Sequence, residues 1–214
     1  AACGVNAIKF QHRVLEHLYS ADENDSLDLA TQYTKDLLLK YNLSKSDLFL
    51  LMDYVKSKGI DVICTPFDYG ALNDLLEYPK LDALKIASAD CINLPFVEDI
   101  LRTGLPVIIS TGMTTAKELQ VVSNLLKRFH NNVALLHCNS TYPAPYHDLN
   151  LSYLEELKTF SPSKIVGWSG HERGWHICHV AIGLGAAIIE KHFTLDKELE
   201  GNDHQVSLLP PEMK

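Results

Sequence analysis

The stretch "PVIISTGM" (106–113), followed by "TTAKELQVVSNLLKRF" (114–129), indicates the architecture of this chain. The first segment is a short continuous apolar run that ends in polar residues, as expected of a strand buried on both faces of a sheet. The second begins at threonine, carries apolar residues at helical spacing and has Lys and Arg in its last turn. Together the two segments predict one strand followed by one helix.

The same unit recurs along the chain. Six further apolar runs end in polar residues, at 5–11, 61–68, 82–90, 133–140, 164–171 and 186–193. Helical patterns lie between most of them, at 44–59, 93–104, 151–160 and 172–185. Strands that alternate with helices are typical of an α/β fold with parallel strands.

Two α/β architectures fit this pattern, an open doubly wound sheet and a TIM (β/α)₈ barrel. No GxGxxG follows any of the apolar runs, which disfavours the dinucleotide-binding form of the open sheet. Seven units after the start "AACGVNAIKF", which resembles a helix end, a glycine stop and a strand, favour a barrel that lacks its first strand. We therefore expect residues 1–214 to be part of a longer barrel protein.

Composition excludes several classes of protein. The net charge of -8 gives no basic surface for nucleic acid, and no apolar run is long enough to cross a membrane. The five cysteines form no CxxC pair, and the chain starts with no signal peptide, so we expect free thiols and a cytoplasmic location.

Polar residues gather at the predicted strand ends, where TIM-barrel enzymes carry their active sites. Lysines and hydroxyls on different strands suit a phosphate or carboxylate ligand; they are Lys9, Lys85, Ser88, Ser110, Ser140 and Ser169. His171 and His192 end successive strands and can share a divalent metal, although two unrelated side chains would show the same spacing. A zinc site of His171, His176 and His179 is a weaker alternative.

Eight segments in order along the chain are similar to the sialic acid synthase family, which includes N-acetylneuraminate, legionaminic acid and pseudaminic acid synthases and spore coat polysaccharide enzymes. The segments are "KFQ" (9–11), "TPFD" (65–68), "KIASAD" (85–90), "STGM" (110–113), "LLHCNSTYPAPYHDLNL" (135–151), "GWSGHERG" (167–174), "IIEKHFTLDK" (188–197) and "GNDHQVSLLPPE" (201–212). They span nearly the whole chain, so the set is far more specific than any one member.

The resemblance implies a TIM-barrel transferase that condenses phosphoenolpyruvate with an N-acylated hexosamine of the N-acetylmannosamine type. The products would be a nine-carbon 2-keto acid and phosphate. By matching motifs, phosphoenolpyruvate would be held by Lys9, Thr65, Lys85, Ser88, Ser110, Ser140 and Ser169. The sugar would be held by Gln11, Tyr142 and Asp203, and Mn²⁺ or Mg²⁺ by His171 and His192. Asp90 would stand with Lys9 and Lys85 as a catalytic group that steadies positive charge at carbon 2 and takes a proton from water.

Three departures from the family pattern affect this expectation. Asp90 stands where several members carry the longer Glu. A first strand that supplies a glutamate, and a C-terminal antifreeze-like domain that lends an arginine to a partner subunit, would lie outside residues 1–214. The resemblance also implies a homodimer. It does not choose among N-acetylmannosamine, its 6-phosphate and diacetamido-trideoxy hexoses, and the acidic stretch 19–32 is a candidate active-site loop or insertion.

Two alternatives to this function stay open. One is another metal-dependent phosphoenolpyruvate aldol-type synthase that makes a seven- or eight-carbon keto acid. The other is a barrel that binds sugar or metal without turnover.

Overall fold

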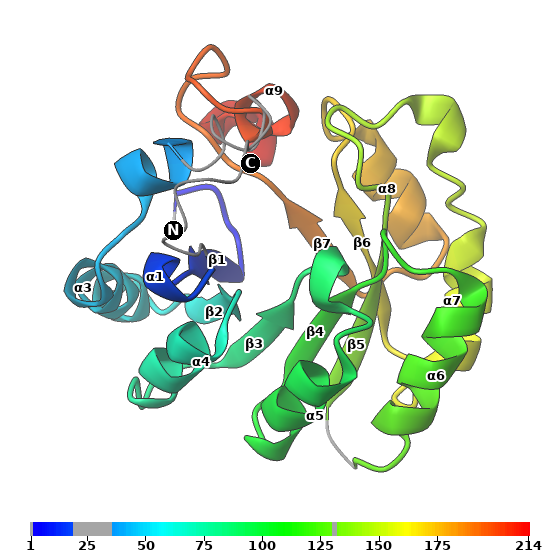
Figure 1. Cartoon of the computed structure of the whole chain (residues 1–214). Coiled ribbons are helices and arrows are strands. Elements are labelled where there is room, and N and C mark those ends of the chain that lie inside the picture. The colour runs from blue at the N-terminus through cyan, green and yellow to red at the C-terminus, as the bar shows by residue number, and fades with distance from the viewer. Residues whose placement is uncertain (1, 19–35, 130–131) are drawn as a thin grey trace, which may run out of the picture.

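The computed structural model describes residues 2–18, 36–129 and 132–214. Seven parallel strands form one sheet in the order of the sequence (Figure 1). Their bounds are β1 Ala7–His12, β2 Asp61–Pro66, β3 Ala83–Ile86, β4 Val107–Ser110, β5 Val133–Cys138, β6 Val166–Gly170 and β7 Ile188–Lys191. All seven predicted strands are confirmed, and each is shorter than its apolar run. Most of the polar residues predicted to end the strands lie at or just beyond the strand ends, whereas Lys9 lies within β1.

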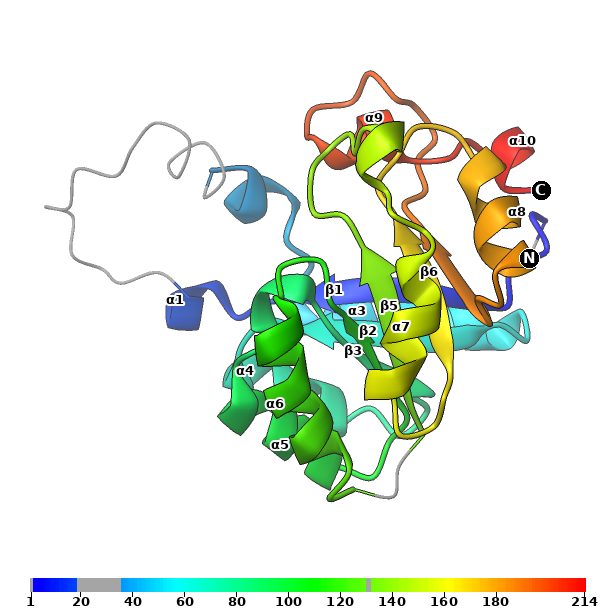
Figure 2. The same cartoon turned by 90° about the vertical axis from the view of Figure 1, so that its right-hand side faces the viewer.

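Helices follow most strands and lie along the outside of the curled sheet (Figures 1 and 2). Those bounds are α1 Leu15–Leu18, α3 Lys45–Ser57, α4 Tyr69–Leu76, α5 Leu94–Arg102, α6 Ala116–Leu126, α7 Tyr153–Phe160, α8 His176–Gly183, α9 Asp203–Val206 and α10 Pro210–Met213. Two 3₁₀ turns, η1 Ser88–Asp90 and η2 Tyr146–Asp148, lie in the loops after β3 and β5. No helix in these parts of the chain is long and apolar enough to cross a membrane.

Side-chain caps fix where the helices begin. The Thr115 hydroxyl accepts from the Glu118 backbone N–H while the Glu118 carboxylate accepts from the Thr115 backbone, which is a complete capping box for α6. Ser44, the first residue of the helical pattern 44–59, caps α3, and Asp68 caps α4, a helix that the sequence patterns did not single out.

The helix predicted at 172–185 begins four residues later, at His176. Gly174 has φ +74°, a left-handed conformation that does not continue a helix. Residues 172–175 therefore form a loop at the carboxyl end of β6 and not a first helical turn.

The sheet curls until its edge strands face each other. Lys9 on β1 and Glu190 on β7 form an ion pair with 2.6 Å between Nζ and Oε1. Lys9 and Glu190 lie on the inner face of the curled sheet. The outer face contributes to one apolar cluster that includes Leu84, Ile109 and Leu135, none of them exposed to solvent. The parallel α/β fold is thus confirmed in its curled form. The closed eight-stranded barrel stays a prediction, since the strands in the described ranges form an open sheet with edges at β1 and β7.

Two other expectations have different outcomes. All five cysteines are free, and four of them are buried. The whole acidic stretch 19–32 lies outside the described residues, so its suggested role as an active-site loop or insertion stays a prediction.

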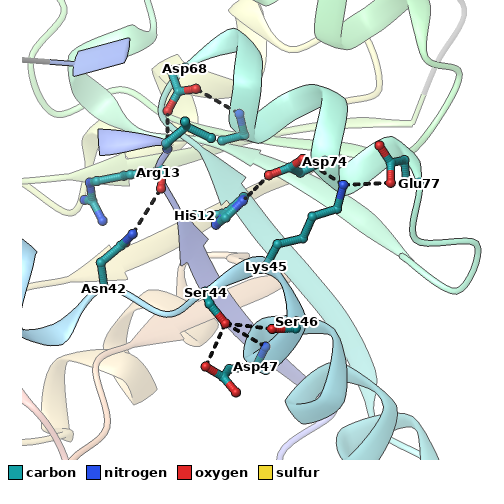
Figure 3. Close-up of polar contacts among 12 residues, drawn as sticks. His12, Arg13, Asn42, Ser44, Lys45, Ser46, Asp47, Asp68, Asp74 and Glu77 are labelled. Carbon is teal, nitrogen blue, oxygen red and sulfur yellow. Dashed lines mark hydrogen bonds and ion pairs between the residues drawn. The ribbon is translucent and has the colours of Figure 1, made fainter. Parts of the chain in front are cut away.

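A polar network fixes the end of β1 (Figure 3). His12 is buried, and its Nε2 lies 2.9 Å from Asp74 Oδ2 on α4. The other oxygen of Asp74 pairs at 2.9 Å with Lys45 Nζ on α3, and Lys45 also pairs at 2.7 Å with Glu77. Burial alone would raise the pKa of Asp74, but hydrogen bonds from His12 and Lys45 outweigh it and lower that pKa. The network ties an edge strand to two helices.

Replacing Asp74 with alanine should lower the free energy of unfolding by about 1–3 kcal/mol, because it leaves the buried His12 ring without its acceptor. Urea denaturation at pH 7 measures the change. The matched control is Glu77→Ala, which removes the exposed partner of the same lysine and should cost about 0–1 kcal/mol. Equal losses in the two variants would contradict the role given to His12.

Candidate active site

The inner face of the curled sheet carries an ion pair and a hydroxyl around one carboxylate. Glu190 Oε1 accepts from Lys9 Nζ at 2.6 Å and from Ser169 Oγ at 2.9 Å. Ser169 and Glu190 are register partners on β6 and β7, so their side chains leave the sheet on the same side. Lys9 reaches them from β1 across the interior. Residues far apart in the sequence therefore meet at one point.

Lys85 lies deeper in the same interior. Its side chain is buried, and its Nζ donates to Ser110 Oγ at 2.6 Å and to the Ile86 carbonyl at 3.0 Å. Burial lowers the pKa of Lys85 to about 8, although the negative charge of Glu190 opposes that change. Burial would raise the pKa of Glu190, but the charges of Lys85 and Lys9 outweigh it and bring that pKa to about 2. The interior is thus electropositive, with two ammonium groups and one carboxylate.

Three loops converge at Gly112, just after β4. Its backbone N–H donates to Ser88 Oγ at 3.1 Å. A Cβ at this position would lie 2.5 Å from Ser140 Oγ and 2.9 Å from the Cys138 carbonyl, closer than real Cβ atoms approach. Only glycine allows the loops after β3, β4 and β5 to come this close, and their approach brings Ser88 and Ser140 together.

The two predicted metal-binding histidines are neighbours. Their ring centroids lie 5.4 Å apart. His171 Nδ1 lies 2.6 Å from the Asn139 carbonyl, which can only accept, so Nδ1 carries the proton. Its Nε2 is then a lone-pair atom, and it accepts from the Tyr142 hydroxyl at 2.7 Å. Burial lowers the pKa of His171 to about 4 and also lowers that of His192. Both rings are therefore neutral at pH 7.

Two of the predicted sugar ligands lie beside these rings. The Tyr142 ring stacks on His171 with centroids 4.0 Å apart, and Asp203 Oδ2 on α9 lies 3.5 Å from His192 Nδ1. Burial, and then the charge of Asp203, raise the pKa of Tyr142, so its hydroxyl stays protonated. In the described residues no group of three or more His, Cys, Asp and Glu side chains is arranged to hold a metal, so this centre offers two imidazoles.

The remaining predicted residues stand apart from these contacts. Gln11 is exposed and accepts from Arg13 at 2.9 Å, while its register partner Thr65 is buried. Asp90 in η1 hydrogen-bonds to Asn93, and burial raises its pKa. A cavity of about 330 Å³ lies beside Asn93, and none of the predicted site residues lines it. Its lining residues are Phe67, Asp68, Tyr69, Asn93 and Phe96.

His176 and His179 do not join His171. Both rings pack on Trp175 of the same segment, with centroids 4.3 and 5.2 Å away, whereas the His171 ring contacts Tyr142 and His192. This arrangement does not support the zinc alternative.

The sequence patterns gave no role to Glu190, which lies in the predicted strand 186–193. The sequence feature that could have indicated Glu190 is the segment "IIEKHF", in which a strand places a carboxylate and a lysine on opposite faces. The sequence could not show that the carboxylate would meet Lys9, which is 181 residues away.

The chain is similar to several known proteins over nearly its whole length. A protein of Methanocaldococcus jannaschii described as uncharacterised is 39% identical over 213 residues, 99% of this chain and 60% of that protein. The N,N'-diacetyllegionaminic acid synthase of Legionella pneumophila is 36% identical, over 99% of this chain and 62% of that enzyme. The chain thus spans about three fifths of the length of these relatives.

A solved structure shows the same fold. The N-acetylneuraminic acid synthetase of Leptospira borgpetersenii, crystallised in complex with citrate, superposes with a TM-score of 0.87 at 34% identity, over 99% of this chain and 70% of that one. The model of the NeuB family matches residues 1–214. This chain, with its curled parallel sheet and its lysines and histidines at the strand ends, belongs to the NeuB family.

Proposed function

We propose that the protein condenses phosphoenolpyruvate with an N-acylated hexosamine to give a nine-carbon 2-keto sugar acid and phosphate. One observation carries the proposal: in a member of the NeuB family, the electropositive interior around Lys9 and Lys85 adjoins the neutral pair His171 and His192. The first feature suits an anion, and the second suits a divalent metal.

Phosphoenolpyruvate fits the electropositive interior. Lys9 and Lys85 supply two positive charges, and the hydroxyls around them supply directional hydrogen bonds; these are Thr65, Ser88, Ser110, Ser140 and Ser169. Glu190 offsets one of these charges and holds Lys9 in place. The phosphate and carboxylate groups of the substrate would take over part of the role that Glu190 has here.

Mn²⁺ or Mg²⁺ fits the histidine pair. The Asn139 carbonyl fixes the His171 tautomer with its Nε2 lone pair facing Tyr142, and a carbonyl behind a ligating histidine is a common supporting contact at metal centres. Two imidazoles leave positions open for water and substrate. A bound divalent cation would polarise the aldehyde of the open-chain sugar. Tyr142 and Asp203, which lie against the two rings, and Gln11 would orient that sugar.

The chemistry needs a base beside carbon 2 of phosphoenolpyruvate. Carbon 3 of phosphoenolpyruvate forms the new bond to the aldehyde carbon, water adds at carbon 2, and the carbon–oxygen bond to phosphate then breaks. Burial raises the pKa of Asp90, which makes its carboxylate a stronger base for the water proton. Asp90 would have to exchange its bond with Asn93 for that water.

The match to the NeuB family over residues 1–214 is the reason to prefer this reaction over that of a seven- or eight-carbon synthase. It is also the reason to prefer an enzyme over a binding protein without turnover. A homodimer and a cytoplasmic location are part of the proposal, as is the closed barrel.

The protein supplied with phosphoenolpyruvate and Mn²⁺ should release phosphate with one member of a panel of N-acyl hexosamines. The panel contains N-acetylmannosamine, its 6-phosphate and diacetamido-trideoxy hexoses. His171→Ala should lower the rate by at least about 100-fold, since even outer partners of a metal can contribute that much. His147→Ala, which changes an exposed histidine in η2, is the matched control and should keep the full rate. Sugar-independent release, or full activity in His171→Ala, would refute the proposed reaction.

Binding of phosphoenolpyruvate should weaken about tenfold between pH 7 and pH 9. Lys85 has a pKa of about 8, so its ammonium is charged below that pH and loses its proton above it. Calorimetric titration at four or five pH values measures the dissociation constant. Lys85→Arg keeps its charge throughout and should flatten the profile. A wild-type profile as flat as that of Lys85→Arg would show that Lys85 does not bind the anion through its charge.

A further inference from the structure

A second polar cluster lies behind the histidine pair, on the outer face of the same strand ends. Lys191 and Glu172 are buried, with side chains 2% and 0% exposed, and their Nζ and Oε1 atoms lie 3.3 Å apart. Lys191 is the last residue of β7, directly before His192, and Glu172 directly follows His171. Each member of the ion pair is therefore bonded in the chain to one of the histidines.

The stronger contact of Lys191 is with the backbone. Its Nζ donates to the Glu172 carbonyl at 2.6 Å. An ammonium at the end of β7, directly before His192, thereby holds the backbone carbonyl of the residue that follows His171. A buried charged pair is costly to desolvate, and an apolar pair of similar volume would often be as stable. The buried ion pair is therefore better explained by a role in holding the backbone in position than by a contribution to stability.

A glycine makes room for the pair. Gly170 is the register partner of Lys191, and a Cβ there would lie 2.6 Å from Glu172 Oε2 and 2.6 Å from Trp168 Nε1. These two atoms are buried and have no hydrogen-bond partner among the described residues. An indole N–H and a carboxylate oxygen thus converge on the same space, as donor and acceptor. Trp168 is fully buried, so it is a rigid third member of the cluster.

We propose that Glu172, Lys191 and Trp168 form a buried positioning network that sets the spacing of His171 and His192. In this network one water bridges the Trp168 indole N–H and the free carboxylate oxygen of Glu172. The proposal rests on the proposed function for the identity of the bound group, a divalent cation. These residues touch no reacting atom. They act through the backbone that carries the two imidazoles.

The test is the double variant Glu172→Gln/Lys191→Met, which removes both buried charges together and keeps the side-chain volumes close. Without metal, the imidazole nitrogen signals of His171 and His192 in long-range ¹H–¹⁵N spectra should both shift. Mn²⁺ binding, followed by electron paramagnetic resonance of the free ion, should weaken about tenfold, as for other outer partners of a metal. Phosphoenolpyruvate binding, which uses the lysines of the inner face, should change less than about twofold.

The matched control is Lys158→Met/Glu155→Gln, which makes the same substitutions in a partly exposed pair with 2.7 Å between charges. It should leave the imidazole signals and Mn²⁺ binding unchanged.

If the first double variant does not fold, Glu172→Gln alone keeps the bond from Lys191 to the carbonyl and should shift both imidazole signals by a smaller amount. Unchanged imidazole signals and Mn²⁺ affinity in a folded variant would overturn the proposal. Absence of Mn²⁺ binding in the unaltered protein would refute the metal of the proposed function, and the metal-free spectra would still decide the role of the network.

Discussion

The shared carboxylate of Glu190 is the interaction on which the candidate site depends. Lys9 and Lys85 come from different strands, and two ammonium groups in one interior repel each other. Glu190 gives both a counter-charge, bonds Lys9 directly and is itself held by Ser169. Without this carboxylate the first and last strands of the sheet would bring like charges together. With it, the curled sheet keeps two ammonium groups and one carboxylate together in its interior.

The inner and outer faces of the strand ends carry different groups of residues. Ser169, Glu190 and His192 lie inside the curl with the groups proposed to meet substrate. Trp168 and Lys191 alternate with them and point outward, into the layer beneath α8. Because successive side chains of a strand face opposite ways, these inner residues are flanked in the chain by the outer ones: Trp168 precedes Ser169, and Lys191 lies between Glu190 and His192. An alteration to the outer layer is therefore transmitted to the inner one through the backbone.

Much of this organisation could be predicted from residue patterns. Continuous apolar runs such as "PVIIS" identify strands covered on both faces, and threonine or serine before an apolar helical period identifies where α3 and α6 begin. The start of α8 could not be predicted in this way, because Glu172 and Arg173 suit a helix. The left-handed conformation of Gly174 keeps these residues out of the helix, and only the structure shows that conformation. For the site, the rule that polar residues at carboxyl ends of parallel strands meet predicted that His171 lies close to His192 and that Lys9 and Ser169 share one centre, while the roles of these residues stay predictions.

The sequence by itself determined the order of strands and helices, the end of the sheet at which the polar groups gather, and the motifs shared with the NeuB family, since these follow from local periodicity and from residue types at fixed spacing. Only the tertiary structure decided which partners those groups have. The curl of the sheet brings Lys9 to Glu190, the convergence of loops on Gly112 brings Ser88 to Ser140, and the Asn139 carbonyl fixes the proton on His171. These contacts join residues on different strands, and their distances depend on the twist and packing of the whole sheet, which no local pattern encodes.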